Sequence, residues 1–289
     1  MTIPVLNPES GFRRLRIDFA YDGTEFAGWA RQPDLRTVQG ELEDVISTIV
    51  QHPVSCVTAG RTDAGVHATG AVLHVDIPAT DTNPNRKSDE WDIDNFAYRI
   101  NRILNEDIRV LSITPAPANF HARYSAISRS YEYKLADLSR PVSPLERLYV
   151  ADWYRNLDLD VMNKASSMML GEHDFSAFCK YREGATPIRT LTEFSWVRDS
   201  QGLLIASLTA ESFGYNMVRN LVGAVVAVGE GRSDYDWILR VLTEKSRVSD
   251  SYVFPSKGLT LVTVRYPEES ELLARAEAAL EYFADRDEE

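Results

Sequence analysis

The alternation of apolar and polar residues divides the first part of the chain into short elements. Residues 14–21 alternate as in a half-buried strand, and residues 37–50 carry apolar side chains at a helical spacing. The polar stretch 78–90 should be exposed. Continued in this way, the pattern predicts strands 14–21, 54–59, 70–77 and 108–113, and helices 37–50 and 93–104. Their order is β-α-β-β-α-β.

The second part repeats this order without obvious sequence identity. Its pattern predicts strands 130–135, 191–198, 203–210 and 260–266, and helices 160–170, 216–228 and 235–242. Two split βαβ halves indicate a pseudo-duplicated α+β fold, a mainly antiparallel sheet with helices on one face. The other face and a cleft between the halves would then remain for a ligand.

The pattern also predicts four segments. They are an N-terminal tail 1–11, a first α+β half 12–125, a second α+β half 126–267 and an acidic C-terminal segment 268–289. In the last segment, acidic residues alternate with Leu272, Leu273, Ala276, Ala279, Leu280 and Phe283. This spacing fits an amphipathic helix, and a frayed acidic tail is the alternative.

The net charge excludes less than its size suggests. The 289 residues carry a formal charge of −12, which by itself argues against a nucleic-acid partner. Segment 268–289 holds nine acidic residues against two arginines and accounts for −7 of that charge. The remaining body is rich in arginine, whose planar fork suits phosphates and bases. RNA binding therefore stays open, although many of these arginines should pair with carboxylates.

Several kinds of protein are disfavoured by the composition. No apolar run approaches the roughly 20 residues that span a bilayer, and no signal core is visible, so we expect a cytoplasmic protein without a membrane partner. Cys56 and Cys179 are far apart and fit free thiols better than a disulfide or metal framework. His67 and His74, seven residues apart across a strand, point to opposite faces and make a poor metal pair.

The most informative stretch is Ala59-Gly60-Arg61-Thr62-Asp63-Ala64-Gly65-Val66-His67, between two predicted strands. Its glycines allow a sharp turn or a close backbone approach, so that Asp63 can be presented into a cleft beside the cation of Arg61. Taken alone, such spacing is more often a turn in which the aspartate hydrogen-bonds the backbone. The stretch by itself leaves a catalytic and a structural role open.

The same stretch closely resembles the motif Gly-Arg-Thr-Asp-x-Gly-Val-His of the tRNA pseudouridine synthases typified by synthase A. The resemblance covers residues 16–267 and includes Tyr21-Asp22-Gly23, Gly28-Trp29-Ala30-Arg31-Gln32, Thr37-Val38-Gln39-Gly40-Glu41, Phe120-His121-Ala122-Arg123-Tyr124-Ser125, Arg129-Ser130-Tyr131-Glu132-Tyr133, Met217-Val218-Arg219-Asn220 and Gly258-Leu259-Thr260-Leu261. It implies the fold of that family and isomerisation of uridine to pseudouridine, without cofactor or metal. In that family the target uridines are positions 38, 39 and 40 of the tRNA anticodon arm, and the enzyme is a homodimer.

The resemblance also implies which residues carry the chemical step. Asp63 would be the essential carboxylate, a nucleophile, and Arg219 its ion-pair partner at the start of an otherwise apolar helix. An arginine there is costly unless paired, and a snorkelling side chain is the structural alternative. Tyr131 would stack on the base and assist proton transfer, and spacing does not separate it from Tyr133 on the same face. Leu259 would lie against the uracil, or belong to the strand core.

Arginines account for the expected RNA contacts. A base inside a stem must be extruded before an enzyme can act on it, and the resemblance implies that Arg61 inserts beside the flipped nucleotide. The candidate phosphate contacts are Arg31, Arg36, Arg123 and Arg129.

Two other functions remain as alternatives. A non-catalytic RNA-binding or RNA-chaperone protein could keep this fold, and a nucleoside hydrolase could use the same carboxylate with a positioned water. The chain departs from the common family pattern at Ala71 and at Tyr215-Asn216, which puts the exact set of tRNAs in question. The sequence leaves open whether Asp63 attacks the base, attacks the sugar or acts as a base.

Overall fold

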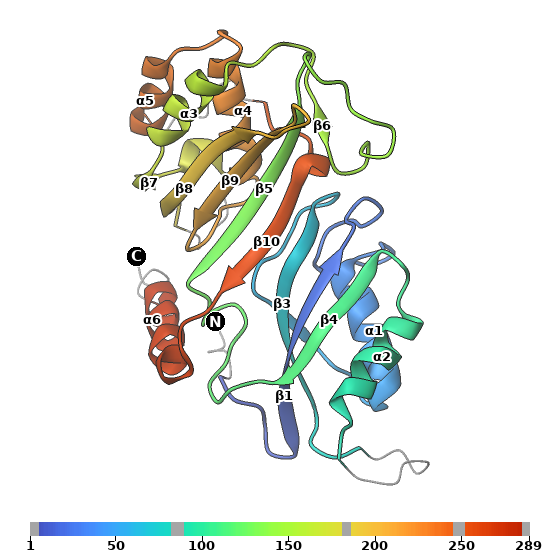
Figure 1. The fold of residues 1–289 in the computed structure, drawn as a ribbon. Coiled ribbons are helices and arrows are strands. Elements are labelled where there is room, and N and C mark those ends of the chain that lie inside the picture. Colours follow the sequence, from blue (N-terminus) through green and yellow to red (C-terminus); the bar gives the residue numbers. More distant parts are fainter. Residues whose placement is uncertain (1–5, 82–89, 181–185, 245–251, 285–289) are drawn as a thin grey trace. The chain divides into compact units, whose positions relative to one another are not determined.

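The computed structural model describes residues 6–81, 90–180, 186–244 and 252–284 (Figure 1). The chain forms two compact units, one of residues 1–127 with 263–289 and one of residues 128–262. The segments proposed from sequence divided the chain at 125/126 and 267/268, whereas these units divide at 127/128 and 262/263. The chain therefore leaves the first unit once and later returns to it.

The first unit has the β-α-β-β-α-β order. Its elements are β1 (Phe12–Tyr21), α1 (Val38–Val50), β2 (Cys56–Thr58), β3 (His67–Pro78), α2 (Ile93–Ile103) and β4 (Ile108–Pro115), with η3 (Glu269–Glu271) and α6 (Leu272–Ala284) from the end of the chain. Strand β1 lies between β4 and β3 and pairs antiparallel with both, and β2 pairs antiparallel with β3. Residues 82–89 of the predicted polar stretch 78–90 lie outside the described residues, and Asp81, within them, is buried.

The two faces of this unit's strands differ in polarity. Leu15 lies opposite Val75, and Ile17 opposite Leu73, and all four side chains are buried. Helices α1 and α2 lie together on one side of β1, β3 and β4, as Figure 1 shows. Side chains alternate between faces along a strand, so residues such as His74 project to the opposite face. The helices therefore cover one face and leave a more polar one.

The second unit contains the remaining elements. They are β5 (Ser128–Ala136), β6 (Ala151–Asp152), α3 (Leu159–Ser167), β7 (Gly171–Asp174), η1 (Ser176–Phe178), β8 (Ile188–Arg198), β9 (Leu204–Ala210), α4 (Met217–Gly229), α5 (Tyr235–Glu244), η2 (Ser256–Gly258) and the start of β10 (Leu259–Arg265). The strand order is β10-β5-β9-β8-β7. The pairs β5–β9, β8–β9 and β7–β8 are antiparallel, and β5–β6 is parallel.

Helix α4 is the buried centre of the second unit. Every residue of this helix except Arg219 is buried. A Cβ added to Gly223 would come within 2.0 Å of the Tyr252 carbonyl oxygen, and one added to Gly229 within 2.5 Å of Met162 Cγ. Both glycines therefore let neighbouring segments approach closer than any side chain would allow.

The α+β class and its mainly antiparallel pairing are confirmed. Of the two possibilities for the C-terminal segment, the structure has the amphipathic helix: α6 buries Leu272, Ala276 and Ala279. The short strands β6 and β7 were not predicted from sequence, because two and four residues are too few to show alternation.

Candidate active site

The Asp63 loop connects β2 to β3 in the first unit. The amide of Trp29 donates to the Thr62 carbonyl oxygen at 3.0 Å, and the amide of Val66 donates to the Asp63 carbonyl oxygen at 3.2 Å. Gly65 has φ +76°, which favours glycine. The backbone on both sides of Asp63 is therefore fixed, and its side chain is half-buried.

Two glycines from the segment after β1 lie directly against this loop. A Cβ on Gly23 would lie 1.9 Å from the Val66 carbonyl oxygen. Gly28 has φ +103°, and a Cβ there would lie 3.0 Å from the Thr62 carbonyl oxygen. Gly23, Gly28 and Trp29 of these landmark stretches thus contact the backbone of the Asp63 loop directly, a role that their sequence did not reveal.

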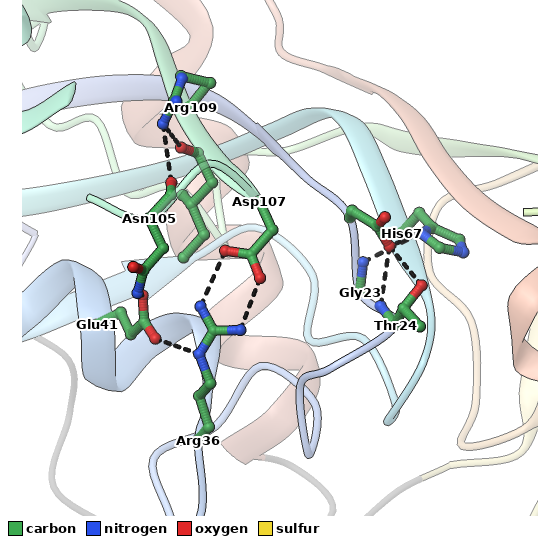
Figure 2. Close-up of polar contacts among 10 residues, drawn as sticks. Gly23, Thr24, Arg36, Glu41, His67, Asn105, Asp107 and Arg109 are labelled. Atoms are coloured by element: carbon green, nitrogen blue, oxygen red, sulfur yellow. Dashed lines mark hydrogen bonds and ion pairs between the residues drawn. The ribbon is translucent and has the colours of Figure 1, made fainter. Parts of the chain in front are cut away.

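A histidine completes this support (Figure 2). The buried His67 ring accepts a hydrogen bond at Nδ1 from the Gly23 amide at 3.0 Å, and Asp22 Oδ1 lies 3.1 Å from the same nitrogen. Partial burial raises the pKa of the Asp22 carboxyl, but the hydrogen bonds that the hydroxyl and the amide of Thr24 donate to it bring the pKa below its ordinary value. Asp22 is therefore ionised at neutral pH and holds the turn before the loop.

Two of the arginines expected to contact phosphate have carboxylate partners. Arg31 pairs with Glu43 at 2.9 Å and with Asp44 at 2.7 Å. Arg36 holds Asp107 with both terminal nitrogens, at 2.6 and 2.9 Å, and also pairs with Glu41 (Figure 2). The hydrogen bonds that Arg36 donates to Asp107 and then to Glu41 raise the pKa of Arg36 above its ordinary value.

The other candidate arginines differ in exposure. Arg61 is exposed on the Asp63 loop. Arg123 is exposed, and its guanidinium lies 5.4 Å from the centre of the Tyr124 ring. Arg129 is buried in β5, where Nη1 donates to the Glu211 carbonyl oxygen at 2.6 Å.

The second unit separates the two candidate tyrosines. Tyr133 is fully buried, and its hydroxyl donates to the Pro255 carbonyl oxygen at 2.7 Å. Burial raises the pKa of Tyr133 above its ordinary range, so the hydroxyl stays protonated. The Tyr131 ring meets Phe213 edge-on at 5.2 Å, and 7% of its surface is accessible. The structure therefore gives the Tyr133 hydroxyl a structural partner in the Pro255 carbonyl oxygen.

Arg219 is anchored at the start of α4. Its Nε donates to the Phe254 carbonyl oxygen at 2.5 Å, and Nη1 donates to Asn216 Oδ1 at 3.2 Å. The Phe254 amide in turn donates to the Arg219 carbonyl oxygen at 3.2 Å. Leu259, at the start of β10 in the same unit, is buried. Arg219 and Leu259 thus lie in the second unit, whereas Asp63 lies in the first.

A sequence profile described as tRNA pseudouridine synthase matches residues 19–125 and 165–267, which is more than half of the chain. The chain belongs to the tRNA pseudouridine synthase family. The first matched segment contains Asp63 and Arg61, and the second contains Arg219 and Leu259. Tyr131 and Arg129 lie between the two segments.

Curated relatives extend this pseudouridine synthase match over nearly the whole chain. The tRNA pseudouridine synthase A of Frankia casuarinae is 46% identical over 92% of this chain and 94% of its own. That of Leifsonia xyli is 48% identical over 91% and 95%, and that of Mycobacterium leprae 46% identical over 91% and 93%. A solved 3-hydroxy-3-methylglutaryl-coenzyme A reductase from Streptococcus pneumoniae is 10% identical over 93% of this chain and 62% of its own, with a TM-score of 0.19.

The structure also bears on metal binding, on membrane insertion and on the state of the two cysteines. Within the part of the chain that the structure describes, no group of three or more His, Cys, Asp or Glu side chains is arranged to hold a metal ion. No helix in that part has both the length and the apolar character needed to span a membrane. Cys56 and Cys179 are free thiols, and burial raises the pKa of Cys179 to about 11.

Proposed function

We propose that this chain isomerises uridine to pseudouridine at positions 38, 39 and 40 of the tRNA anticodon arm, with Asp63 as the essential carboxylate. The proposal includes a cytoplasmic homodimer that needs neither metal nor cofactor. The names of the curated relatives support the tRNA substrate. The observation that carries the role of Asp63 is the support of its loop.

The contacts around this loop fix the backbone position of one carboxylate residue, Asp63. The amides of Trp29 and Val66 hold the carbonyl oxygens of Thr62 and Asp63. Gly23 and Gly28 allow contact distances to this loop that a side chain would prevent. A turn that only reverses the direction of the chain does not need these supporting contacts. Catalytic groups gain from this arrangement, because a small displacement of a reacting group has a large effect on rate.

The reaction requires a carboxylate that is ionised at neutral pH. The N1–C1′ bond of the uridine breaks, the base turns, and a C5–C1′ bond forms, while the proton on C5 leaves and N1 regains one. No electrons are gained or lost, so residues alone can supply the chemistry. In this proposal Arg219 stabilises the ionised Asp63, Tyr131 stacks on the base and moves a proton, and Leu259 lies against the uracil.

The RNA contacts are assigned to arginines, of which Arg129 is buried and the others are at least partly exposed. Arg61 would stack where the extruded base had been, because a planar guanidinium can replace a base in a stack. Arg31, Arg36, Arg123 and Arg129 would contact phosphates. For Arg31 and Arg36 this requires RNA to compete with, or lie beside, the carboxylates that hold them.

The test is incubation with unmodified tRNA transcripts, followed by mapping of pseudouridine. Asp63→Asn should abolish turnover while tRNA affinity stays within a few-fold, since phosphate contacts carry affinity. Asp34→Asn is the matched control: it removes the same charge at an exposed position with φ 58°, which asparagine adopts readily. Pseudouridine formed by Asp63→Asn would overturn the proposal. Binding without turnover by the unaltered chain would indicate a non-catalytic RNA-binding protein, and free uracil a hydrolase.

Arg219→Met tests the ion pair separately. Methionine keeps an apolar stem but removes the charge, which should raise the pKa of Asp63 and move the acid limb of the pH–rate profile upward. Arg219→Lys should restore rate only in part, because it lacks the planar fork that also holds the Phe254 carbonyl oxygen. An unshifted acid limb at the original rate would refute the pairing. Light scattering of the purified chain tests the homodimer through its mass.

A further inference from the structure

The turn formed by residues 120–125 lies on the polar face of the first unit. Its backbone amides have an unusual set of acceptors. The Ala122 amide donates to Nδ1 of His74 at 3.0 Å, and the amides of Arg123 and Tyr124 donate to Nδ1 of His121 at 3.3 and 3.2 Å. Three successive amides are thus fixed by two imidazole rings.

The carbonyl side of the turn is fixed as well. The Phe120 carbonyl oxygen accepts from Arg14 Nη1 at 2.9 Å, and the Ala122 carbonyl oxygen accepts from the Tyr266 hydroxyl at 2.8 Å. Ser125 and His121 form two further hydrogen bonds. The His121 amide donates to the Ser125 hydroxyl oxygen at 3.0 Å, and the Ser125 amide donates to the His121 carbonyl oxygen at 2.9 Å. A turn held through both its donors and its acceptors has little freedom to move.

These contacts require both rings to be neutral. An imidazole nitrogen accepts a hydrogen bond only when it carries no proton. Burial, and next the charge of Arg14, lower the pKa of His74 to about 2 and that of His121 to about 4. Arg14 itself is paired with Asp76 at 2.7 Å. At neutral pH the two rings therefore act as fixed acceptors and contribute no charge.

The turn presents one exposed cation. Arg123 is exposed, its guanidinium lies over the Tyr124 ring, and that ring packs on the His121 ring at 4.5 Å. The guanidinium is thus placed by a backbone and a ring that both depend on His121. A cation held in position loses less conformational freedom when it binds a phosphate.

We propose that His121 and His74 are positioning residues, which fix the 120–125 turn so that Arg123 contacts a backbone phosphate of the tRNA. The proposal rests on the proposed function for the identity of the RNA. Two uncharged side chains would thereby influence the salt-dependent, electrostatic part of RNA binding. A purely structural role in the fold does not give that effect.

The experiment is a titration of the full chain with unmodified tRNA transcript at several salt concentrations. Arg123→Gln should reduce the slope of log affinity against log salt by about 0.7 to 0.9, the value of one lost phosphate contact. His121→Leu should reduce it by a similar amount although it removes no charge, and Arg123→Gln added to it should cause little further loss. His121→Asn should retain the slope, because its Oδ1 can take the place of Nδ1 as acceptor.

The outcomes against the proposal are equally definite. A normal salt slope in folded His121→Leu, or in Arg123→Gln, would overturn it. If His121→Leu does not fold, Tyr266→Phe decides in the same way, since it removes only the hydroxyl that holds the Ala122 carbonyl oxygen. Binding is measured apart from turnover, so a chain that bound tRNA through Arg123 without forming pseudouridine would refute the proposed function and leave this inference standing.

Discussion

The hydroxyl of Tyr21 lies 2.7 Å from the hydroxyl of Thr62, the residue immediately before Asp63. Both side chains are buried, and they join the end of β1 to the Asp63 loop. The pair therefore links the rigid centre of the first unit to the residue proposed to react.

Tyr21→Phe should weaken that link. Loss of one buried hydrogen bond should lower the free energy of unfolding by about 0.5–1.5 kcal/mol, and the looser loop should lower kcat more than it raises KM. Urea unfolding and single-turnover rates measure the two effects. Tyr98→Phe, on the exposed face of α2, should change neither. Full kcat in Tyr21→Phe would show that this hydroxyl pair does not position the loop.

Gly28→Ala should lower the free energy of unfolding more than Gly11→Ala does. Both glycines have positive φ, but a Cβ at Gly11 meets nothing within 4 Å, whereas one at Gly28 presses on the Thr62 carbonyl oxygen. We expect a backbone cost of about 1–2 kcal/mol for Gly11→Ala and a larger loss for Gly28→Ala, with lower turnover only in the latter. Equal losses in thermal or urea unfolding would show that the close approach contributes nothing.

The two tyrosines of β5 should respond in opposite ways to loss of the hydroxyl. Tyr133→Phe leaves the Pro255 carbonyl oxygen without its donor and should cost about 1–3 kcal/mol of stability, with the rate of the folded enzyme retained. Tyr131→Phe should lower the rate of turnover. Comparing urea unfolding with turnover on one tRNA transcript separates them. A rate lost in Tyr133→Phe but kept in Tyr131→Phe would reverse the assignment.

Stability should fall below pH 6.5 because of the two buried histidines. Their pKa values are lower in the folded chain than in the unfolded one, so the unfolded state binds protons first as the pH falls. The stability is therefore complete above about pH 6.5 and is lost on the way down toward about 4 for His121 and about 2 for His74. Each contributes up to about 1.4 kcal/mol per pH unit.

Urea unfolding between pH 7 and pH 5 measures that loss. His74→Asn should make the decline shallower, because asparagine can accept the Ala122 amide without taking up a proton. His52→Asn, at an exposed position, is the control. An unchanged slope in His74→Asn would mean that His74 is not the group responsible.

Local patterns predicted the longer strands and helices and the Asp63 loop. Strand alternation and helical spacing extend over many residues, and a glycine-bounded aspartate is visible in nine. Spacing did not separate Tyr131 from Tyr133, because the partner that distinguishes them, Pro255, is 122 residues away. It also gave no sign that Arg36 meets Asp107, 71 residues on. Contacts between distant residues decide such questions, and a single sequence does not show them.

The support residues illustrate the same limit. Gly23, Gly28 and His67 stood in stretches singled out from sequence, yet their contacts with the loop depend on how two segments meet. The sequence likewise did not indicate that the His121 ring accepts hydrogen bonds from two amides of its own turn.

The return of the chain to the first unit has a consequence for its synthesis. The Ile127 amide donates to the Arg265 carbonyl oxygen at 2.9 Å, and Arg275 donates to the Ala126 carbonyl oxygen at 3.3 Å. Residues 128–262 thus form an insertion between two parts of one unit. A ribosome makes the inserted unit before it supplies the end of β10 and helix α6 to the first unit. The Asp63 loop, made before the inserted unit, consequently belongs to the unit that is completed after it.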